Sequence, residues 1–389
     1  MAENIFRWLI LGLAWLTAIG GFVAQLSPPP LMPFLMREFG ITHAESGLVM
    51  TLFSLPGLLV IVFGVLSDRF GAKQLGAVSL FSLILGSIIV AISPSFEWIL
   101  LGRLLGGVGT QSITVVAPAI ISQWFPPAEL GTAMGIYGTG LPIAVVLAFD
   151  LLGRFGIAYG WRLPFYLEVA IGIVVLGLFW RFVRDGPLLQ KRQNEIAHPA
   201  TSLRKGLINH ETWKIGVYFL LVMAGWTAFT TWAPTLLNES KGLDLAYATF
   251  LASVPMMMSL VCMPFIGWLS DRLRRRKLLI LIGSTLTTSV ILVIPYASGL
   301  TLILSFVILG VAFALIPAIV FSLAGETLGP GSAGTSFGIL ITCVSVGQTV
   351  APYLVGLVRD MTGSLLYSFA AMSMFVGPSI IIAFLIKAR

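Results

Sequence analysis

Apolar residues run in long, unbroken stretches along most of this chain, and short polar or Gly/Pro-rich segments separate the stretches. A hydrocarbon core about 30 Å thick is crossed by an apolar helix of roughly 20 residues. The stretches reach that length and are continuous rather than alternating, which indicates helices instead of barrel strands. The pattern predicts twelve membrane-spanning helices, at 8–36, 43–66, 74–93, 97–122, 130–153, 161–184, 211–238, 244–270, 277–298, 300–325, 333–357 and 364–387.

The two halves of the chain repeat the same short phrases. GVLSDRF at 64–70 nearly matches GWLSDRL at 267–273, and GTAMGI at 131–136 nearly matches GTSFGI at 334–339. Such self-similarity predicts two parallel repeats related by an axis along the membrane normal, with a substrate site near the midplane between them. The expected parts are an N-terminal six-helix bundle at 1–184, a cytoplasmic linker at 185–210 and a C-terminal six-helix bundle at 211–389.

Composition and charge agree with a membrane location. Hydrophobic residues make up 57% of the chain and charged residues 10%, whereas a soluble domain carries roughly 25% charged residues. The net charge is +7, and 17 of the 23 Lys and Arg residues fall in loops on one side of the predicted spans. This positive-inside pattern predicts a multi-pass protein of the cytoplasmic (inner) membrane with both termini in the cytoplasm. The distribution of basic residues therefore reflects the orientation of the chain in the membrane, and we expect no nucleic-acid partner.

Four motifs carry a resemblance to a known family. GVLSDRFGAK at 64–73 lies between the second and third spans, and its echo at 267–277 lies between the eighth and ninth. The fourth span contains GRLLGGVGTQ at 102–111, and the fifth contains GTAMGIYGTGLP at 131–142. Together they resemble the signature loops, the arginine–glycine helix and the glycine-rich helix of the major facilitator superfamily, and the resemblance covers the entire chain.

The resemblance implies an all-α integral membrane protein, with 12 transmembrane helices in two pseudo-symmetric six-helix bundles. It implies a secondary transporter that works by alternating access, with a cavity closed within one chain and hence a monomer. The fourth and fifth spans are also similar to those of organic-anion and nitrate/nitrite porters. Leu141 and Pro142, however, stand where the nitrate group places an asparagine, which argues against nitrate as the substrate.

The repeated loop predicts a gate. Asp68 and Asp271 lie at the cytoplasmic ends of helices, where a carboxylate suits the N-terminus of a neighbouring helix better than its own helix end. We expect Asp68 to dock on the eleventh span near 331–335 and Asp271 on the fifth near 129–132, holding the two halves together. The alternative is that these charges only anchor a loop. The other predicted gate residues are two glycines that permit close helix approach and a tight turn, and two arginines with their candidate acidic partners: Gly64, Gly71, Arg69, Arg272, Glu326 and Glu129.

Arg103 is the most informative single residue, because a charge inside the fourth span costs at least a few kcal/mol. At helical spacing its face continues through Gln111 and Thr114, so it can border a water-filled cavity. One hypothesis is that Arg103 attracts or binds an anionic group of the substrate, or modulates proton transfer. The other is that it pairs with Asp150 or Glu168 as a buried brace. Asp150 and Glu168 are also the candidates for proton coupling.

The remaining candidates for substrate binding lie in the first, seventh and eleventh spans. Prolines at 28–30 remove three backbone donors and must break the first span, either to line a cavity or as a packing kink. Aromatic residues in the seventh span fit either the cavity or an interfacial belt, and a mid-helix glutamine needs a partner of some kind. These candidates are Gln25, Trp226, Thr230, Gln348 and Tyr353.

Other signals exclude functions. The chain has no Walker sequence and no nucleophile–base pair, so neither ATP-driven transport nor an enzyme is expected, and no cofactor or metal site is predicted. THAE at 42–45 indicates a capping box that starts the second span. The leading hypothesis is a secondary active transporter for a small organic solute, in particular an organic anion such as a carboxylate, with proton symport as one form of coupling. The alternatives are a proton-driven drug or metabolite efflux antiporter and a transporter-like membrane sensor.

Overall fold

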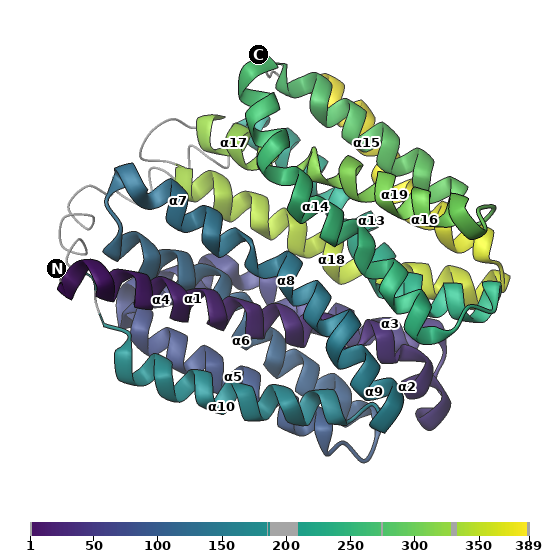
Figure 1. The fold of residues 1–389 in the computed structure, drawn as a ribbon, viewed down its shortest axis with the longest axis horizontal. Coiled ribbons are helices and arrows are strands. Elements are labelled where there is room, and N and C mark those ends of the chain that lie inside the picture. The colour runs from purple at the N-terminus through teal and green to yellow at the C-terminus, as the bar shows by residue number, and fades with distance from the viewer. Residues whose placement is uncertain (1, 185, 187–208, 274, 328–332, 387–389) are drawn as a thin grey trace. The chain divides into compact units, whose positions relative to one another are not determined.

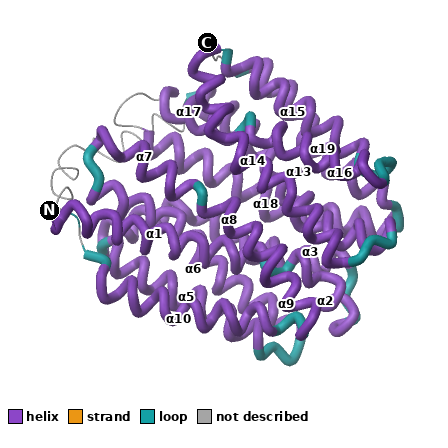
Figure 2. Tube along the Cα trace, in the orientation of Figure 1, coloured by secondary structure: helices purple, strands orange, loops and turns teal. Residues whose placement is uncertain are grey.

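The computed structural model describes residues 2–184, 186, 209–273, 275–327 and 333–386. Within these residues every regular element is helical, and short loops join the helices (Figure 2). The predicted linker at 185–210 lies almost entirely outside the described residues.

The first half of the chain contains thirteen helical elements in the described part. They are α1 (Ala2–Leu26), η1 (Pro29–Leu31), α2 (Met32–Phe39), α3 (His43–Ser54), η2 (Leu55–Leu59), α4 (Val60–Phe70), α5 (Ala72–Ala91), α6 (Phe96–Trp124), α7 (Pro127–Gly138), α8 (Gly140–Val146), η3 (Leu147–Leu152), α9 (Gly153–Tyr159) and α10 (Leu163–Phe182). The short elements fall at 29–31, 55–59 and 147–152, so three of the expected spans are interrupted rather than continuous α-helices.

The described part of the second half is built from longer helices. They are α13 (His210–Lys241), α14 (Leu245–Leu273), α15 (Arg276–Val293), α16 (Gly299–Ala314), α17 (Pro317–Thr327), α18 (Ala333–Thr362) and α19 (Leu365–Leu385).

Twelve helical stretches among the described residues are long and apolar enough to cross a membrane, which confirms the predicted number. They are Phe6–Phe39, His43–Phe70, Ala72–Ala91, Phe96–Trp124, Glu129–Tyr159, Leu163–Phe182, His210–Lys241, Leu245–Met263, Arg276–Val293, Gly299–Phe321, Gly338–Thr362 and Leu365–Leu385. The agreement has a simple cause, because lipid offers no partner for backbone groups and helices satisfy their own.

The chain folds into two compact units, and they do not coincide with the two sequence repeats. The first unit consists of Met1–Leu31 and Leu52–Ile196, and the second of Met32–Thr51 and Ala197–Arg389. The segment Met32–Thr51 therefore packs with the C-terminal helices, although the repeat assigns it to the first half. This segment holds α2 and most of α3.

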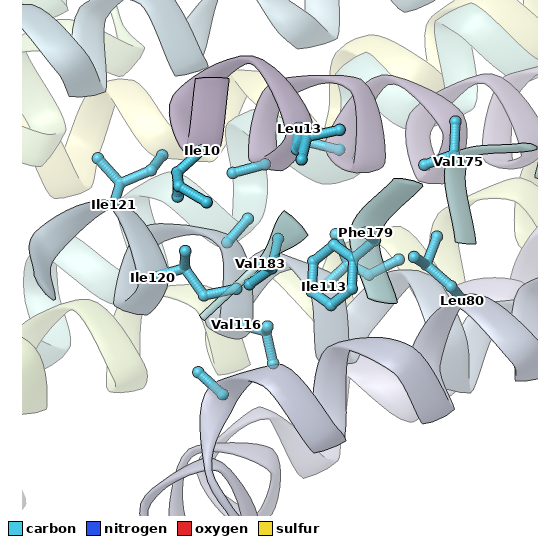
Figure 3. Packing of buried hydrophobic residues seen from close by; sticks show 14 of the residues in the cluster. Ile10, Leu13, Leu80, Ile113, Val116, Ile120, Ile121, Val175, Phe179 and Val183 are labelled. Carbon is cyan, nitrogen blue, oxygen red and sulfur yellow. The ribbon is translucent and has the colours of Figure 1, made fainter. Parts of the chain in front are cut away.

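An apolar cluster contributed by α1, α5, α6 and α10 forms the core of the first unit (Figure 3). Within this unit α6 packs along α5, and α5 packs along α10 (Figure 1). Glycines permit the closest of these approaches, because a Cβ at Gly86 would lie 2.5 Å from the Gly102 carbonyl oxygen. The cluster residues labelled in Figure 3 are Ile10, Leu13, Leu80, Ile113, Val116, Ile120, Ile121, Val175, Phe179 and Val183.

In the second unit α13 packs against α18 and α19, and α14 packs against α16. The N-terminal part of α3 lies directly on α18. A Cβ at Gly47 would lie 2.8 Å from the Pro352 carbonyl oxygen, and a Cβ at Gly356 would lie 2.6 Å from that of His43. These two glycines therefore bring the backbones of α3 and α18 into contact.

Candidate functional site

The first membrane span breaks where the sequence places three consecutive prolines. Helix α1 ends at Leu26, and its last regular bond runs from the Ser27 N–H to the Val23 carbonyl. Prolines 28–30 have no N–H to donate to the carbonyls of Ala24, Gln25 and Leu26. The predicted break is thus present, and it leaves acceptors at the end of α1 that need donors from elsewhere.

Arg103 of α6 supplies donors at this break. Its Nη1 donates to the Ala24 carbonyl at 2.5 Å, and its Nη2 donates to the Gln25 carbonyl at 3.1 Å. The guanidinium also lies over the Phe53 ring, 3.9 Å from the centroid. Arg103 is only 2% exposed, so these contacts are made away from water. The sequence suggested acidic partners for Arg103 and did not suggest these backbone carbonyls.

Glu168 of α10 binds the same break from another helix. Its carboxylate accepts a hydrogen bond from Ser27 Oγ at 2.5 Å and another from Ser87 Oγ at 3.0 Å. Its charge interacts with that of Arg103. The two predicted charged residues are thus brought together around Ser27, whose role in holding the carboxylate was not foreseen.

Of the other candidates in the first unit, Gln25 lies on α1, and Gln111 and Thr114 lie on α6. Gln25 and Gln111 are 9% and 6% exposed, and Thr114 is half-buried with its hydroxyl bonded to the Gln111 carbonyl of its own helix. Asp150 lies in the π-helical turn η3, on the fifth span. Such turns often occur at functional sites.

The candidates of the second unit are spread along α13 and α18. Trp226 stacks on Phe313 with the ring centroids 3.8 Å apart, and the Thr230 hydroxyl donates to a carbonyl of its own helix. Gln348 is half-buried and Tyr353 is exposed. Trp226 is 6% exposed, so its environment is that of a packed side chain.

A polar cluster at the start of α3 was missed by the sequence analysis. Nδ1 of His43 lies 2.8 Å from Asp360 Oδ1, and Nε2 lies 3.0 Å from Glu239 Oε2. The second oxygen of Asp360 accepts from the Ala44 N–H at 2.7 Å, and Arg359 Nη2 donates to Glu239 at 3.2 Å. These five residues, called the His43 cluster below, join α3 to α13 and α18 within the second unit.

The predicted capping box beside this cluster is confirmed. The Thr42 N–H donates to Glu45 Oε2 at 2.8 Å, and the Glu45 N–H donates to the Thr42 hydroxyl at 3.2 Å. The capping box could be predicted from the sequence because Thr42 and Glu45 lie within four residues of each other. The partners of His43 lie far away in the sequence.

The predicted gate residues of the first unit lie around the turn from α4 to α5. Gly71 ends α4 with φ of +89°, so the expected tight turn needs a glycine there. Outside its own helix, no described heavy atom lies within 4 Å of a Cβ built at Gly64, so the expected close approach is not seen. Arg69 lies 5.4 Å over the ring of Phe70, and Asp68 is exposed.

Glu129 has a partner that differs from those suggested by the sequence. Its carboxylate lies 2.8 Å from Nη2 of Arg7 at the start of α1. The side chains of Asp271 and Glu326 lie outside the described residues, and Arg272 is exposed. Docking of the two repeated aspartates on helix termini therefore stays a prediction.

The fold and these sites define a class of protein. Twelve helical spans among the described residues, with a buried arginine beside a half-buried glutamate at a broken span, are typical of a secondary transporter rather than an enzyme. The chain belongs to the Major Facilitator Superfamily, whose family model matches residues 10–352. It is therefore a multi-pass membrane transporter without enzymatic activity.

Known relatives and a solved structure agree with the family. The hexuronate transporter of Bacillus subtilis is 23% identical over 85% of this chain and 83% of the relative. The probable sulfoacetate transporter SauU of Cupriavidus necator is 26% identical over 92% of this chain and 88% of the relative. A crystal structure of a bacterial homologue of the human lysosomal transporter Spinster, inward-facing and unoccupied, matches with a TM-score of 0.79 at 18% identity, over 98% of this chain and 95% of that one. The predicted resemblance to organic-anion porters is thus confirmed.

Proposed function

We propose that this transporter moves a small carboxylate across the cytoplasmic membrane by alternating access, with a proton as co-substrate. The observation that carries the proposal is the burial of Arg103 beside Glu168 at the break of the first span. Hexuronate and sulfoacetate, for which two relatives are named, are both carboxylates. The distribution of Lys and Arg supports termini on the cytoplasmic side, and we expect a monomer.

The charges of this pair supply the coupling. While Glu168 is ionised, its charge compensates that of Arg103, and an additional anion gains little from entering the region. When Glu168 takes up a proton, Arg103 loses the compensation that the Glu168 charge supplied, at membrane depth, where a charge is costly. A carboxylate then restores neutrality. Proton and anion therefore bind better together than separately, which is the thermodynamic requirement for symport.

Polar and aromatic side chains are proposed as substrate contacts in each unit considered by itself. The first unit offers Gln25 on α1 and Gln111 and Thr114 on α6, the helix that carries Arg103. The second unit offers Trp226, Thr230, Gln348 and Tyr353 on α13 and α18. Amide and hydroxyl groups suit the hydroxyl groups of a sugar acid, and an aromatic face suits its ring or chain.

The test is uptake of labelled carboxylates into proteoliposomes under an imposed pH gradient. The substrates are D-glucuronate, D-galacturonate and sulfoacetate, with D-glucose as a neutral control and a lipophilic cation to represent the efflux alternative. We expect accumulation of at least one carboxylate that depends on the gradient and collapses with a protonophore. Transport of the lipophilic cation alone would favour the efflux antiporter and refute the proposal.

Glu168→Gln separates the proton from the anion. A neutral amide mimics the protonated carboxyl, so carboxylate binding should persist at pH 8 while accumulation driven by the pH gradient is lost. Glu97→Gln is the matched control, because Glu97 is an exposed carboxylate at the start of α6 and bonds to Ser95. Wild-type accumulation by Glu168→Gln would rule out Glu168 as the proton carrier.

A further inference from the structure

The segment Met32–Thr51 is joined to the first unit at two places that lie at or near irregular turns. The chain leaves that unit after Leu31 and re-enters it at Leu52. The first crossing follows the 3₁₀ turn η1 at 29–31, and the second precedes the 3₁₀ turn η2 at 55–59. Such turns interrupt helices where the chain bends or moves. The first crossing therefore lies directly after an irregular turn, and the second lies near the end of α3, just before another; these two places are called hinges below.

Arg103 contacts the chain beside both hinges. At the first, its two donated bonds go to the carbonyls of Ala24 and Gln25. In a continuous helix these carbonyls would accept from residues 28 and 29, which are prolines, so Arg103 replaces the two missing donors. At the second hinge, the same guanidinium lies on the Phe53 ring.

The helix that carries Arg103 is shaped for this position. A Cβ at Gly107 would collide with the backbone carbonyl of Phe53, and one at Gly106 would lie 3.1 Å from its ring. The glycines thus allow α6 to approach the end of α3 closely enough for Arg103 to reach across to α1.

We propose that Arg103 is a positioning residue: it anchors the two hinges that carry the segment Met32–Thr51, by replacing the donors that Pro28 and Pro29 remove. The segment is held on the second unit by the His43 cluster and by the Thr51 hydroxyl, which donates to the Thr349 carbonyl at 2.6 Å. Because Arg103 fixes the chain at both hinges, a movement of the segment would rotate the chain about the hinges. Without Arg103, the end of α1 would fray and would not transmit the movement. The guanidinium does this through its hydrogen bonds, while its charge remains the one compensated by Glu168.

The test is a rescue experiment that needs no knowledge of the substrate. The variants are Arg103→Gln, the pair Pro28→Ala with Pro29→Ala, and the triple variant that combines all three. Arg154→Gln is the matched control, since Arg154 is an exposed arginine on α9. Each purified variant is followed by thermal unfolding. A second readout is the width of the distance distribution between spin labels at Arg37→Cys and Tyr159→Cys, in a background with Cys262→Ser and Cys343→Ala.

We expect Arg103→Gln to lower the Tm by at least about 3 °C and to broaden the distribution. The alanines restore two backbone N–H groups, so the triple variant should regain most of the lost Tm and the narrow distribution, whereas Arg154→Gln should change neither. If Arg103→Gln cannot be purified, the triple variant should be purifiable in its place. Failure of the alanine pair to rescue Arg103→Gln in both readouts, when the pair itself is stable, would overturn the proposal. An arginine that served only the substrate would leave the Tm and the distance distribution of Arg103→Gln unchanged, and that result would also overturn the proposal.

Discussion

The His43 cluster makes a prediction whose size can be worked from the structure. Both ring nitrogens of His43 face carboxylate oxygens, at 2.8 Å for Asp360 and 3.0 Å for Glu239. A neutral imidazole carries one N–H, so both contacts are hydrogen bonds only when the ring is protonated. Arg359 also belongs to the cluster and donates to Glu239. Its single positive charge balances only one of the two negative charges of Glu239 and Asp360. His43→Gln should therefore destabilise the protein most where the ring is protonated.

The magnitude follows from the exposure of the groups. The side chains of His43, Glu239 and Asp360 are 17%, 28% and 23% exposed, between a surface pair and a buried one. Exposed ion pairs contribute about 0.2–1 kcal/mol, and hydrogen bonds to charged groups contribute about 1.5–3 kcal/mol. His43 makes two partly exposed charge-assisted hydrogen bonds, and a glutamine at this position keeps at most one of them. We therefore expect His43→Gln to lower the free energy of unfolding by about 1–2 kcal/mol at pH 6.

The assay is thermal or denaturant unfolding of the purified protein between pH 6 and pH 9. An imidazole in the unfolded chain titrates near 6.5, so the stabilisation is fullest below that value and declines as pH rises and the folded ring loses its proton. The difference between wild type and His43→Gln should therefore shrink toward pH 9. His210→Gln is the matched control, because His210 is exposed at the start of α13. A difference that grows with pH, or a control that behaves like the variant, would refute this reasoning.

Three further substitutions test the packing around the sites. Ser27→Ala removes a hydroxyl that donates to Glu168 and should cost about 1–3 kcal/mol, measured by unfolding, with Ser95→Ala as a control whose hydroxyl bonds the exposed Glu97. Gly107→Ala inserts a methyl group against the Phe53 backbone and should cost about 1–3 kcal/mol, whereas Gly131→Ala meets open space and should not destabilise. Trp226→Ala removes the ring stacked on Phe313 and should cost about 3–5 kcal/mol; a loss under about 1 kcal/mol would show that the stack is not packed as the distances indicate.

The sequence was sufficient for features whose cause is local or imposed by lipid. Span number follows from apolar run length, since the bilayer leaves little choice but a helix. The turn at Gly71 and the capping box at 42–45 follow from residues that lie within a few positions of each other. The break before Pro28 follows from the missing N–H groups.

The partners of the charged side chains were beyond such local patterns. His43 reaches Glu239 and Asp360, which are 196 and 317 residues away, and only the folded chain brings them together. For Arg103 the sequence offered two acidic candidates, whereas the atoms that accept the two hydrogen bonds described above are backbone carbonyls, which every residue possesses. A signal was nevertheless present, because Pro28 and Pro29 identify the two carbonyls that must find another donor.

Arg103 and Asp360 each bind a helix end whose backbone groups lack partners within the helix. Arg103 binds the end of α1, and Asp360 binds the start of α3, so the two helix ends take charges of opposite sign. The free carbonyls at the end of α1 carry partial negative charge and receive the cation of Arg103. The free N–H groups at the start of α3 carry partial positive charge and receive the anion of Asp360, which accepts from His43 and Ala44. A charge that caps a helix end keeps its full charge while its hydrogen bonds are satisfied. The protonation of Glu168 can therefore change the electrostatic balance at the break while the bonds from Arg103 to α1 remain in place, so anchoring and coupling are compatible roles for one arginine.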